Sequence, residues 1–368
     1  MGRKSSKVFV GMDVHKESID LALAEEGGEV RHQGQIGGDM NALWRAVRKL
    51  ESSGRELIFV YEAGPCGFAI YRQLTARGHC CWVVAPSNTP RRVRDRIKTD
   101  RRDSMKLAGL ARAGELSPIY VPDLSDEAMR DLVRTREDAV AMQRQARQRL
   151  AALLLRNDLR YVGKTAWTAA HRRWIAELKL PQPAQRIAFE EYVQTIEEST
   201  QRVMRLTHSI EQELGHWRWR SVVAALQACR GIQLIHAVRI VAELGDLARF
   251  DHPRQLMAYL GLIPSEDSSG EHRRQGAITK AGNGSARRAL VEAAWAYRYC
   301  AKVSPIIAHR QTQLPKAAID IAWKAQLRLC ARFRRLAARG ISRNKIVVAI
   351  ARELAGFVWA IARQIKPL

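Results

Sequence analysis

The sequence predicts an α/β domain with a mixed sheet, followed by a longer and mainly helical region. Two observations predict this division. Short apolar runs typical of buried strands recur between Val8 and Ala85, and segments with helical periodicity lie between them. From Asp126 onward the strand pattern ends, and apolar residues recur at helical spacing instead. A length of 368 residues with 46% hydrophobic residues is enough for two or three domains with buried cores.

In the first part of the chain, strands and helices are expected to alternate. The run at 19–23 alternates apolar and polar residues, and the segment 25–29 that follows is typical of a hairpin turn. The order strand, hairpin, helix, strand, helix, strand is typical of a mixed sheet covered by helices. We expect strands at 8–12, 19–23, 57–61 and 81–85, and helices at 41–49 and 67–77.

Two long helices are expected next, from 126 to about 160 and from about 187 to 214. Two prolines separate them, Pro181 and Pro183. In the second helix, apolar residues recur every seven positions on one stripe, at Phe189, Ile196, Val203 and Ile210. The two helices therefore form either an antiparallel coiled-coil hairpin or two ordinary amphipathic helices on a core.

The remainder is expected to be helical, with a polar loop at 264–285 and a tail of basic amphipathic helices at 323–368. The segment around Gly231 resembles a helix-hairpin-helix, although Gln233 stands where a second glycine is usual, and a purely structural turn is the alternative. The predicted domains are 1–125, an α/β domain; 126–215, a helical hairpin; and 216–368, a helical domain.

The charge of the chain indicates a polyanionic partner. It has 61 Lys and Arg against 37 Asp and Glu, a net charge of +24 and a pI near 10.4. Nucleic acid fits better than a membrane, because the late apolar run Leu354–Ala362 has nine residues and a span needs about twenty. The six cysteines lack C-x-x-C spacing, and the basic N-terminus is not a signal peptide. We expect a bacterial cytoplasmic protein associated with the nucleoid.

Four carboxylates are candidates for one metal site. Asp13 and Glu62 end two predicted strands, and Asp100 and Asp103 lie three apart at the start of a predicted helix. Such a cluster needs hard cations to offset its charge, and Mg²⁺ prefers oxygen ligands. Two ions about 4 Å apart would clamp a scissile phosphate. The alternative is that each acid is solvated or paired with a base such as Lys98, Arg101 or Arg102.

These residues lie in three motifs: Gly11–Lys16, Tyr61–Gly64 and Lys98–Ala108. The motifs resemble the acidic motifs of the DEDD insertion-sequence transposases, which are bridge-RNA-guided recombinases related to pilin-gene invertases. The resemblance implies an RNase-H-like first domain, similar to a Holliday-junction resolvase. It also implies that Asp13, Glu62, Asp100 and Asp103 bind Mg²⁺. Ser104 stands where the family pattern has alanine.

The stretch Gly231–Ala289 resembles the second conserved domain of the same transposases. It contains a G-L-x-P segment from Gly261, a Ser-Gly pair at Ser269, and K-x-G-N from Lys280, followed by paired arginines. The resemblance implies that Ser269 is the nucleophile. Ser268, Ser265 and Ser285 are the competing serines. A serine hydroxyl needs activation, and metal ions held by the carboxylates could supply it.

Several cations and aromatic residues are candidates for nucleic-acid contacts. The cationic run before the third acidic motif would ordinarily be a solvated face, but beside a metal site it is expected to contact phosphates, which arginine guanidinium groups bind bidentately. The predicted nucleic-acid contacts are Arg91, Arg92, Arg94, Arg96, Lys98, Arg273, Arg274, Lys280, Arg287 and Arg288. The cationic face of the tail would suit structured RNA or the DNA backbone. Trp217 and Trp219 could stack on bases, but they are expected to pack where the long helix meets the next domain. The histidines, including His15, His236 and His272, are expected to be ordinary polar or core residues, with His272 the one candidate proton carrier.

The predicted function is therefore an RNA-guided DNA transposase or recombinase that cleaves and rejoins strands through a Mg²⁺-assisted serine and a phosphoserine intermediate. The expected partners are donor and target DNA, a structured bridge RNA implied by the resemblance alone, and a second copy of the chain in a dimer or tetramer. The alternatives are a metal-dependent nuclease similar to a junction resolvase, in which water attacks, and a non-catalytic nucleic-acid-binding protein.

Overall fold

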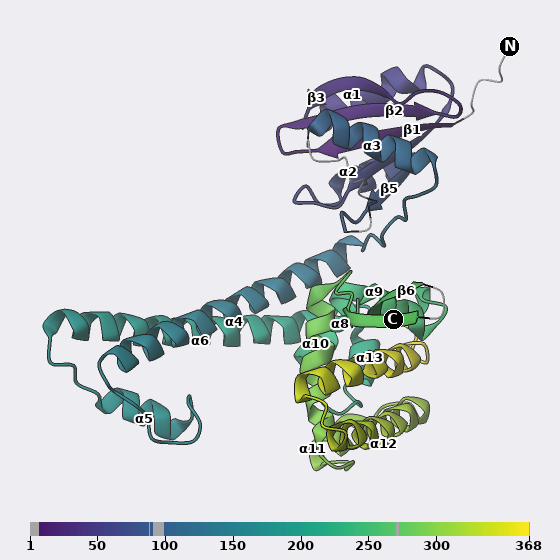
Figure 1. The fold of residues 1–368 in the computed structure, drawn as a ribbon. Helices are drawn as coiled ribbons and strands as arrows, with labels where there is room; N and C mark the ends of the chain where they lie inside the picture. Colours follow the sequence, from purple (N-terminus) through teal and green to yellow (C-terminus); the bar gives the residue numbers. More distant parts are fainter. Residues whose placement is uncertain (1–6, 88, 91–98, 270–271, 368) are drawn as a thin grey trace. The chain divides into compact units, whose positions relative to one another are not determined.

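The computed structural model of the chain describes residues 7–87, 89–90, 99–269 and 272–367. The chain divides after Val121 into two compact units. Figure 1 shows a sheet with helices in the first unit and a mainly helical second unit. The further division predicted at 215 stays a prediction. Among the described helices, none combines the length and the apolar character that a bilayer span requires.

The first unit is built on a five-stranded mixed sheet, as predicted. Its strand order is β3-β2-β1-β4-β5; β1 pairs antiparallel with β2, β2 pairs antiparallel with β3, and β1, β4 and β5 are parallel neighbours. This arrangement is RNase-H-like. The strands are β1 Lys7–Val14, β2 Ser18–Glu25, β3 Arg31–Gly37, β4 Glu56–Glu62 and β5 Cys80–Val84. The sequence pattern located four of the strands, and the hairpin turn predicted at 25–29 connects β2 to β3. No range was predicted for β3 itself, because that strand is largely polar.

Both faces of this sheet are covered by helices. Side chains alternate along each strand, so Val10 and Met12 of β1 pack with α1 and α2, whereas Phe9 packs with α3 on the other face. The helices are α1 Met40–Glu51, α2 Ala69–Ala76 and α3 Asp100–Arg112. Asp39 caps α1 by accepting a hydrogen bond from the Ala42 N–H at 2.9 Å. Because helices cover both faces of the sheet, side chains on both sides of the central strands are buried, and these strands appear in the sequence as nearly continuous apolar runs.

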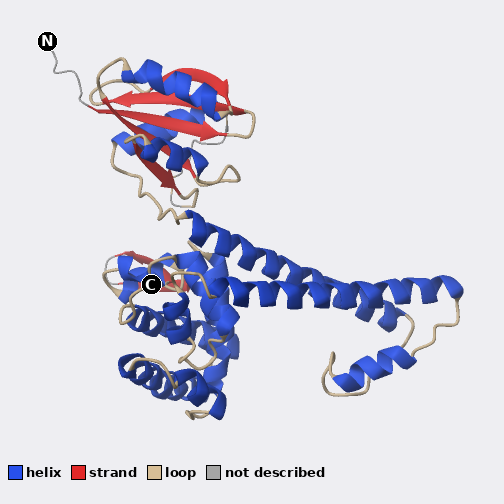
Figure 2. Cartoon of the chain, turned by 180° about the vertical axis from the view of Figure 1, so that it is seen from behind, coloured by secondary structure: helices blue, strands red, loops and turns tan. Residues whose placement is uncertain are grey.

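The second unit begins with two long helices that run antiparallel. These are α4 Leu124–Arg156 and α6 Pro183–Leu214, with the short helix α5 Ala169–Glu177 between them. Gln143 donates to Thr200 at 2.8 Å and Arg136 donates to Thr207 at 2.7 Å, which sets the antiparallel register. Figure 2 shows α4 and α6 side by side over much of their length. The predicted coiled-coil packing of this pair stays a prediction.

Several of the remaining helices pack on α13 Arg343–Ala362. Its side chains Ile346, Ile350, Leu354 and Val358 are fully buried, and α7, α9, α10 and α12 contact it. We predicted that the tail would present a basic amphipathic face; this holds for α12, but α13 is a core helix, because apolar residues occur on several of its sides. The helices are α7 Arg220–Leu226, α8 Leu234–Leu244, α9 Pro253–Tyr259, α10 Gly284–Ala294, α11 Pro305–Gln311 and α12 Lys316–Ala338. Short 3₁₀ turns lie at Leu247–Arg249 and Trp295–Arg298.

The prediction of an irregular polar loop at 264–285 was wrong. This segment contains an antiparallel hairpin of β6 Pro264–Ser269 and β7 His272–Ile278. The side chains of this ribbon that the structure describes are mostly polar and exposed, so its strands lack the apolar alternation that marks a strand in a sequence. The prediction that strands end before residue 126 fails for the same reason.

The turn at Gly231 has a structural explanation. Gly231 has a φ of +85°, and a Cβ atom there would clash with the carbonyl oxygen of Ala293 in α10. Gln233 precedes α8 without a side-chain capping bond. These features favour a packed helical turn over a phosphate-binding hairpin.

Candidate active site

Two of the predicted carboxylates end adjacent parallel strands. Met12 of β1 lies opposite Tyr61 of β4, and Asp13 and Glu62 are the residues that follow this pair. Asp13 shares the face of Phe9, and Glu62 shares the face of Ile58 and Val60, which is the face covered by α3. The register therefore places both carboxylates at one edge of the sheet, on the α3 side.

Helix α3 brings the other two carboxylates to this edge. Asp100 and Asp103 lie in its first turn, and Thr99 caps it by accepting a hydrogen bond from the Arg102 N–H. The helix approaches β1 so closely that a Cβ atom at Gly11 would overlap the Ser104 carbonyl oxygen. A glycine is therefore required at position 11, and it sets how near the acids of α3 come to Asp13.

The far end of α3 is also fixed. The Arg112 guanidinium donates hydrogen bonds to the carbonyl oxygen of Glu25, the last residue of β2, at 2.8 Å, and to that of Gly28 in the turn that follows. Ser104, which departs from the family pattern, is fully buried and donates its hydroxyl hydrogen to the Arg101 carbonyl oxygen at 3.0 Å. The serine is therefore accommodated inside the helix without touching the carboxylates.

We expect the replacement of Gly11 by alanine to lower the free energy of unfolding of the first unit by about 2 kcal/mol, because α3 must move off the sheet. Gly28→Ala is the matched control, since the nearest atom to a Cβ there is 3.8 Å away. Urea titration followed by circular dichroism measures both. Equal stability of the two variants would contradict the role given to Gly11.

His15 was expected to be an ordinary polar or core residue, but it lies among the acids. Its Nε2 is 3.2 Å from Asp13 Oδ2 and 3.5 Å from Asp100 Oδ1. The ligand atoms of these three residues lie within 4.8 Å of one another; in the searched part of the chain, Glu62 and Asp103 lie outside this tightest group. The spacing Asp-x-His at the end of a predicted strand was the sequence signal that could have placed His15 beside Asp13. The chain turns back at this point, and the His15 backbone N–H donates a hydrogen bond to the Ser18 carbonyl oxygen at 2.9 Å.

The electrostatics of this site favour a cation. Burial raises the pKa of the Asp13 carboxyl above its usual value, His15 acts in the opposite direction, and Asp103 and Asp100 raise it further. Carboxylates that disfavour one another's charge in this way are stabilised by a divalent ion. The donor set, mostly carboxylate oxygens with one imidazole, fits a hard or borderline divalent metal.

The second part of the candidate site is the β6-β7 hairpin. Ser269 is the last residue of β6 and pairs with His272 through the backbone. Two competing serines are engaged elsewhere: Ser265 Oγ donates to the Ala277 carbonyl oxygen at 3.1 Å, and Ser285 Oγ accepts from Arg239 Nε at 2.9 Å. The remaining competitor is Ser268, directly before Ser269. The side chains of Ser268, Ser269, His272 and Arg273 lie outside what the structure describes.

The base of the hairpin is held by backbone bonds between its two ends. The N–H of Thr279 donates to Ile263 at 2.9 Å, and the N–H of Lys280 donates to Gly261 at 3.1 Å. The Arg287 guanidinium, which we predicted to contact phosphate, donates to the carbonyl oxygens of Leu260 and Ala281 at 2.7 and 3.0 Å. The G-L-x-P and K-x-G-N segments therefore meet at the base of the strand that ends in Ser269.

A buried carboxylate connects this base to α4. Asn283 caps α10 by accepting from the Ala286 N–H at 2.9 Å, and its Nδ2 donates to Glu243 Oε2 at 2.6 Å. Arg134 of α4 donates to both oxygens of Glu243, at 2.8 and 2.9 Å. Burial alone would raise the pKa of Glu243, but the hydrogen bonds from Arg134 and Asn283 outweigh it and hold the pKa below its usual value. Glu243 is thus an ionised carboxylate that joins three helices.

We expect Glu243→Gln to lower the free energy of unfolding of the second unit by about 2 kcal/mol. The substitution removes the buried negative charge of Glu243 and leaves the guanidinium of the half-exposed Arg134 without its ionic partner. Urea unfolding followed by tryptophan fluorescence is the measurement. Glu211→Gln, at an exposed position on α6 that pairs with His208 at 3.9 Å, is the control and should change the stability little. A Glu243→Gln variant as stable as the unchanged protein would contradict the proposal that Glu243 holds α4, α8 and α10 together.

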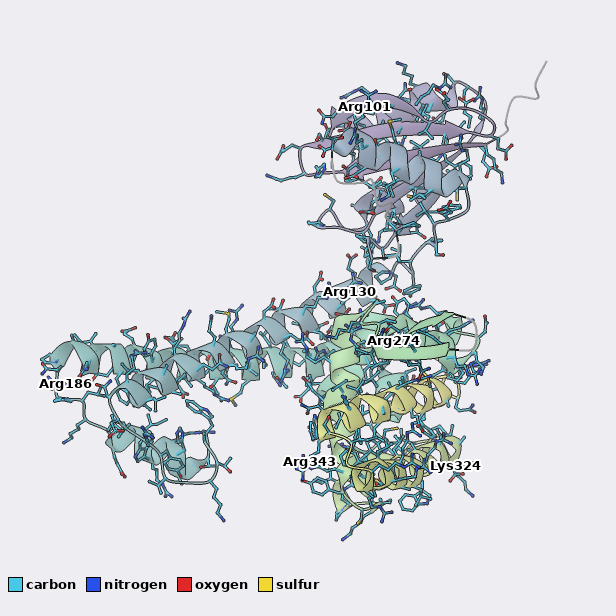
Figure 3. All side chains as sticks on the ribbon, viewed as in Figure 1. Arg101, Arg130, Arg186, Arg274, Lys324 and Arg343 are labelled. Atoms are coloured by element: carbon cyan, nitrogen blue, oxygen red, sulfur yellow. The ribbon has the colours of Figure 1, made fainter. Side chains whose placement is uncertain are left out.

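The other predicted nucleic-acid contacts are distributed unevenly. Figure 3 labels cations on both units, among them Arg274, which is exposed on β7. Lys280 and Arg288 are also exposed, and Lys280 has a φ of +56°. The predicted contacts at Arg91, Arg92, Arg94, Arg96 and Lys98 lie outside the described residues.

The two tryptophans are packing residues. Trp217 and Trp219 are both 4% exposed, and their indole N–H groups donate to Asp126 Oδ1 at 2.8 and 3.0 Å. Arg218, which lies between them in sequence, pairs with the other oxygen of Asp126. They fasten the end of α6 to the start of α4, which agrees with the packing interpretation rather than base stacking.

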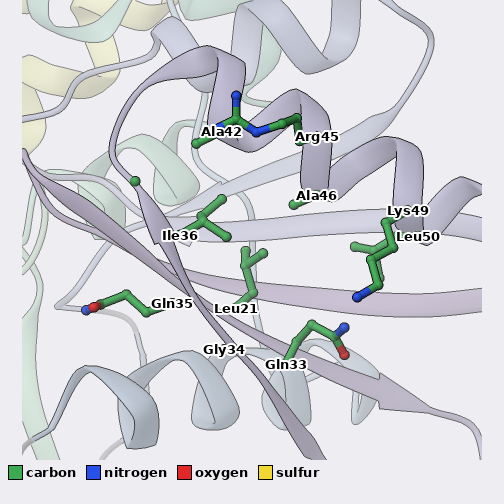
Figure 4. A pocket seen from close by; sticks show the side chains of 11 residues that line it. Leu21, Gln33, Gly34, Gln35, Ile36, Ala42, Arg45, Ala46, Lys49 and Leu50 are labelled. Carbon is green, nitrogen blue, oxygen red and sulfur yellow. The ribbon is translucent and has the colours of Figure 1, made fainter.

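A groove of about 350 Å³ lies on the opposite face of the sheet from α3, between β3 and α1. Figure 4 shows Arg45 and Lys49 of α1 above Gln33 and Ile36 of β3. None of the predicted catalytic residues lines it. The candidate active site is therefore an open carboxylate edge and not this hollow.

Comparison with known proteins agrees with these features. A DEDD-type IS110 family model, described as a transposase, matches residues 10–157, and a second, described as transposase IS116/IS110/IS902 family, matches 223–307. The chain is 45% identical to "Putative transposase y4qE" of Sinorhizobium fredii, over 98% of this chain and 90% of that protein. It is 30% identical to the transposase for insertion sequence element IS1533 of Leptospira borgpetersenii, over 90% and 96%. It is 24% identical to the transposase for insertion sequence element IS1111A of Coxiella burnetii, over 96% and 89%.

The matched ranges contain the carboxylate edge and the serine hairpin, respectively. The identity to two transposases extends over nearly the full length of each. The chain belongs to the IS110/IS116 family of DEDD transposases, enzymes that catalyse DNA transposition.

Proposed function

We propose that the protein transposes DNA through a covalent serine intermediate, with Ser269 as the nucleophile. The Ser269 Oγ attacks a phosphodiester phosphorus, a new O–P bond forms, and the bond to one sugar oxygen breaks. The released sugar hydroxyl takes up the proton that the serine gives up. Attack by a hydroxyl of another strand reverses these changes, so rejoining needs no external energy source. The anchored hairpin that ends β6 at Ser269 is the observation in support of this nucleophile.

We further propose that Asp13, Glu62, Asp100 and Asp103 hold one or two Mg²⁺ ions. The convergence of Asp13 and Asp100 on one point, together with the raised pKa of Asp13, supports this assignment. When bound, such ions stabilise the charge that develops on the phosphate and promote loss of the serine proton. In this proposal Asp13 and Asp100 would supply carboxylate oxygens to the ion, and His15, which lies beside both, holds the two carboxylates close to each other before the metal binds.

The proposed partners are donor and target DNA, a bridge RNA and further copies of the chain. The net charge of +24 supports nucleic-acid binding, and base pairing of a guide RNA would supply the sequence specificity. Joining two duplexes requires more than one active site, which favours a dimer or tetramer. The reaction would take place in the bacterial cytoplasm, on the nucleoid.

The test is an incubation of the full-length protein and its co-purifying RNA with end-labelled transposon-end DNA and Mg²⁺, followed by denaturing gels. We expect a protein–DNA adduct that maps to the peptide containing Ser269 and disappears on addition of a chelator. Free cut ends without an adduct would instead identify a metal-dependent nuclease in which water attacks. An unchanged DNA would leave only a nucleic-acid-binding role.

A further inference from the structure

A fifth carboxylate lies beside the proposed metal site. Asp20 of β2 is directly opposite Asp13 of β1, and both are on the face covered by α3. The Asp20 side chain is 6% exposed. Its Oδ1 accepts a hydrogen bond from His32 Nε2 at 2.8 Å, and its Oδ2 accepts one from Gln35 Nε2 at 3.0 Å. Each oxygen of Asp20 therefore has a partner on the edge strand β3.

A β-bulge in β3 allows both His32 and Gln35 to donate hydrogen bonds to Asp20. His32 and Gln35 are three positions apart, and a regular strand would point them to opposite faces of the sheet. The pairing of β3 with β2 shifts between Leu21 and Ala22, so one extra residue of β3 is accommodated there. Gly34, with a φ of +128°, lies in this irregular segment. The bulge brings His32 and Gln35 to the same face, where both reach Asp20.

Stability alone does not account for this arrangement. Like charges directly opposite each other across two strands are destabilising, and burial of a carboxylate costs free energy even when it is hydrogen-bonded. Ala22 and Ala24, the next residues of β2 on the same face, are fully buried and pack without either cost. A buried acid with two dedicated partners therefore points to a role at the neighbouring site.

We propose that Asp20 is a positioning residue for the metal site. Held by His32 and Gln35, it keeps a fixed negative charge next to Asp13 and so strengthens the binding of a divalent cation. It acts from behind Asp13, because both of its oxygens already accept hydrogen bonds from β3. Residues that support metal ligands in this way change metal affinity by about 10–100-fold. The inference rests on the proposed metal site at Asp13.

The test is calorimetric titration of Mn²⁺ into the full-length protein, without nucleic acid, so that the result does not depend on activity. We expect Asp20→Asn to weaken Mn²⁺ binding about tenfold, because the charge is lost while the shape is kept. Asp39→Asn is the matched control: it removes the same charge from the cap of α1, where asparagine caps equally well, and should leave binding unchanged. Wild-type affinity in a folded Asp20→Asn variant would overturn the inference.

Two further variants keep the test decisive if Asp20→Asn does not fold. Gln35→Leu and His32→Phe each remove one hydrogen bond to Asp20 from partly or fully exposed positions, and each should weaken binding about threefold. Wild-type affinity in both would overturn the inference. Asp13→Asn separates the two proposals: if it leaves Mn²⁺ binding intact, the metal site itself is misplaced, whereas loss of binding there with no effect at Asp20 refutes only the role of Asp20.

Discussion

Replacement of Ser269 by alanine is expected to abolish the protein–DNA adduct and to slow strand exchange about a thousandfold or more. The reason is that alanine has no oxygen to form the bond to phosphorus, and the loss of a nucleophile removes the covalent route altogether. Denaturing gels with end-labelled DNA measure both effects. DNA binding should persist, because Ser269 carries no charge.

Ser268→Ala is the matched control for this experiment. It changes the neighbouring residue of the same strand in the same way, and we expect adduct formation close to that of the unchanged protein. If Ser268→Ala is the variant that loses the adduct, the nucleophile has been assigned one position too late. If Ser269→Ala still produces cut ends, water is the attacking group.

Replacement of Asp13 by asparagine is expected to reduce strand cleavage about a thousandfold. Asparagine keeps the shape of the side chain but removes the charge at the point where Asp13, His15 and Asp100 converge. Cleavage rates at saturating DNA, measured over a range of Mg²⁺ and Mn²⁺ concentrations, test this. The deficit should remain at high metal concentration, because the remaining ligands cannot reproduce the site.

Glu17→Gln is the control for Asp13→Asn. Glu17 lies in the turn between β1 and β2, and its side chain is 82% exposed and paired with Lys16 at 3.0 Å. Removal of its charge should leave cleavage unchanged. A fully active Asp13→Asn variant would refute the metal site, and an inactive Glu17→Gln variant would show that the effect is one of general charge.

The α/β unit was predictable because its physical signals are local. Strands β1, β4 and β5 are covered on both faces and read as apolar runs, and the acids at 100 and 103 precede an apolar helical pattern that identifies α3. Once these elements are placed, adjacent parallel strands bring Asp13 and Glu62 to one edge. The strand ends and one helix face were therefore enough to locate the carboxylates.

The features that escaped prediction depend on contacts distant in sequence or on polar strands. His15 can be recognised as part of the candidate site only when Asp100 of α3, which is distant in sequence, is known to lie beside it. The partners of Asp20 depend on a bulge in β3, which carries few apolar residues. The hairpin β6-β7 is polar throughout most of its length, and the burial of α13 follows from four surrounding helices. Periodicity within one segment reports none of these.

The place of α13 at the centre of the second unit has a consequence for biosynthesis. The first unit has all its strands and helices within residues 7–121, so it can fold while the ribosome is still translating the rest. The second unit cannot close its core until residues 343–362 have been made, because α7, α9, α10 and α12 all pack on that helix. The half that carries the β6-β7 hairpin therefore matures last, and a nascent or prematurely terminated chain has the half with the carboxylate edge but lacks a finished second unit.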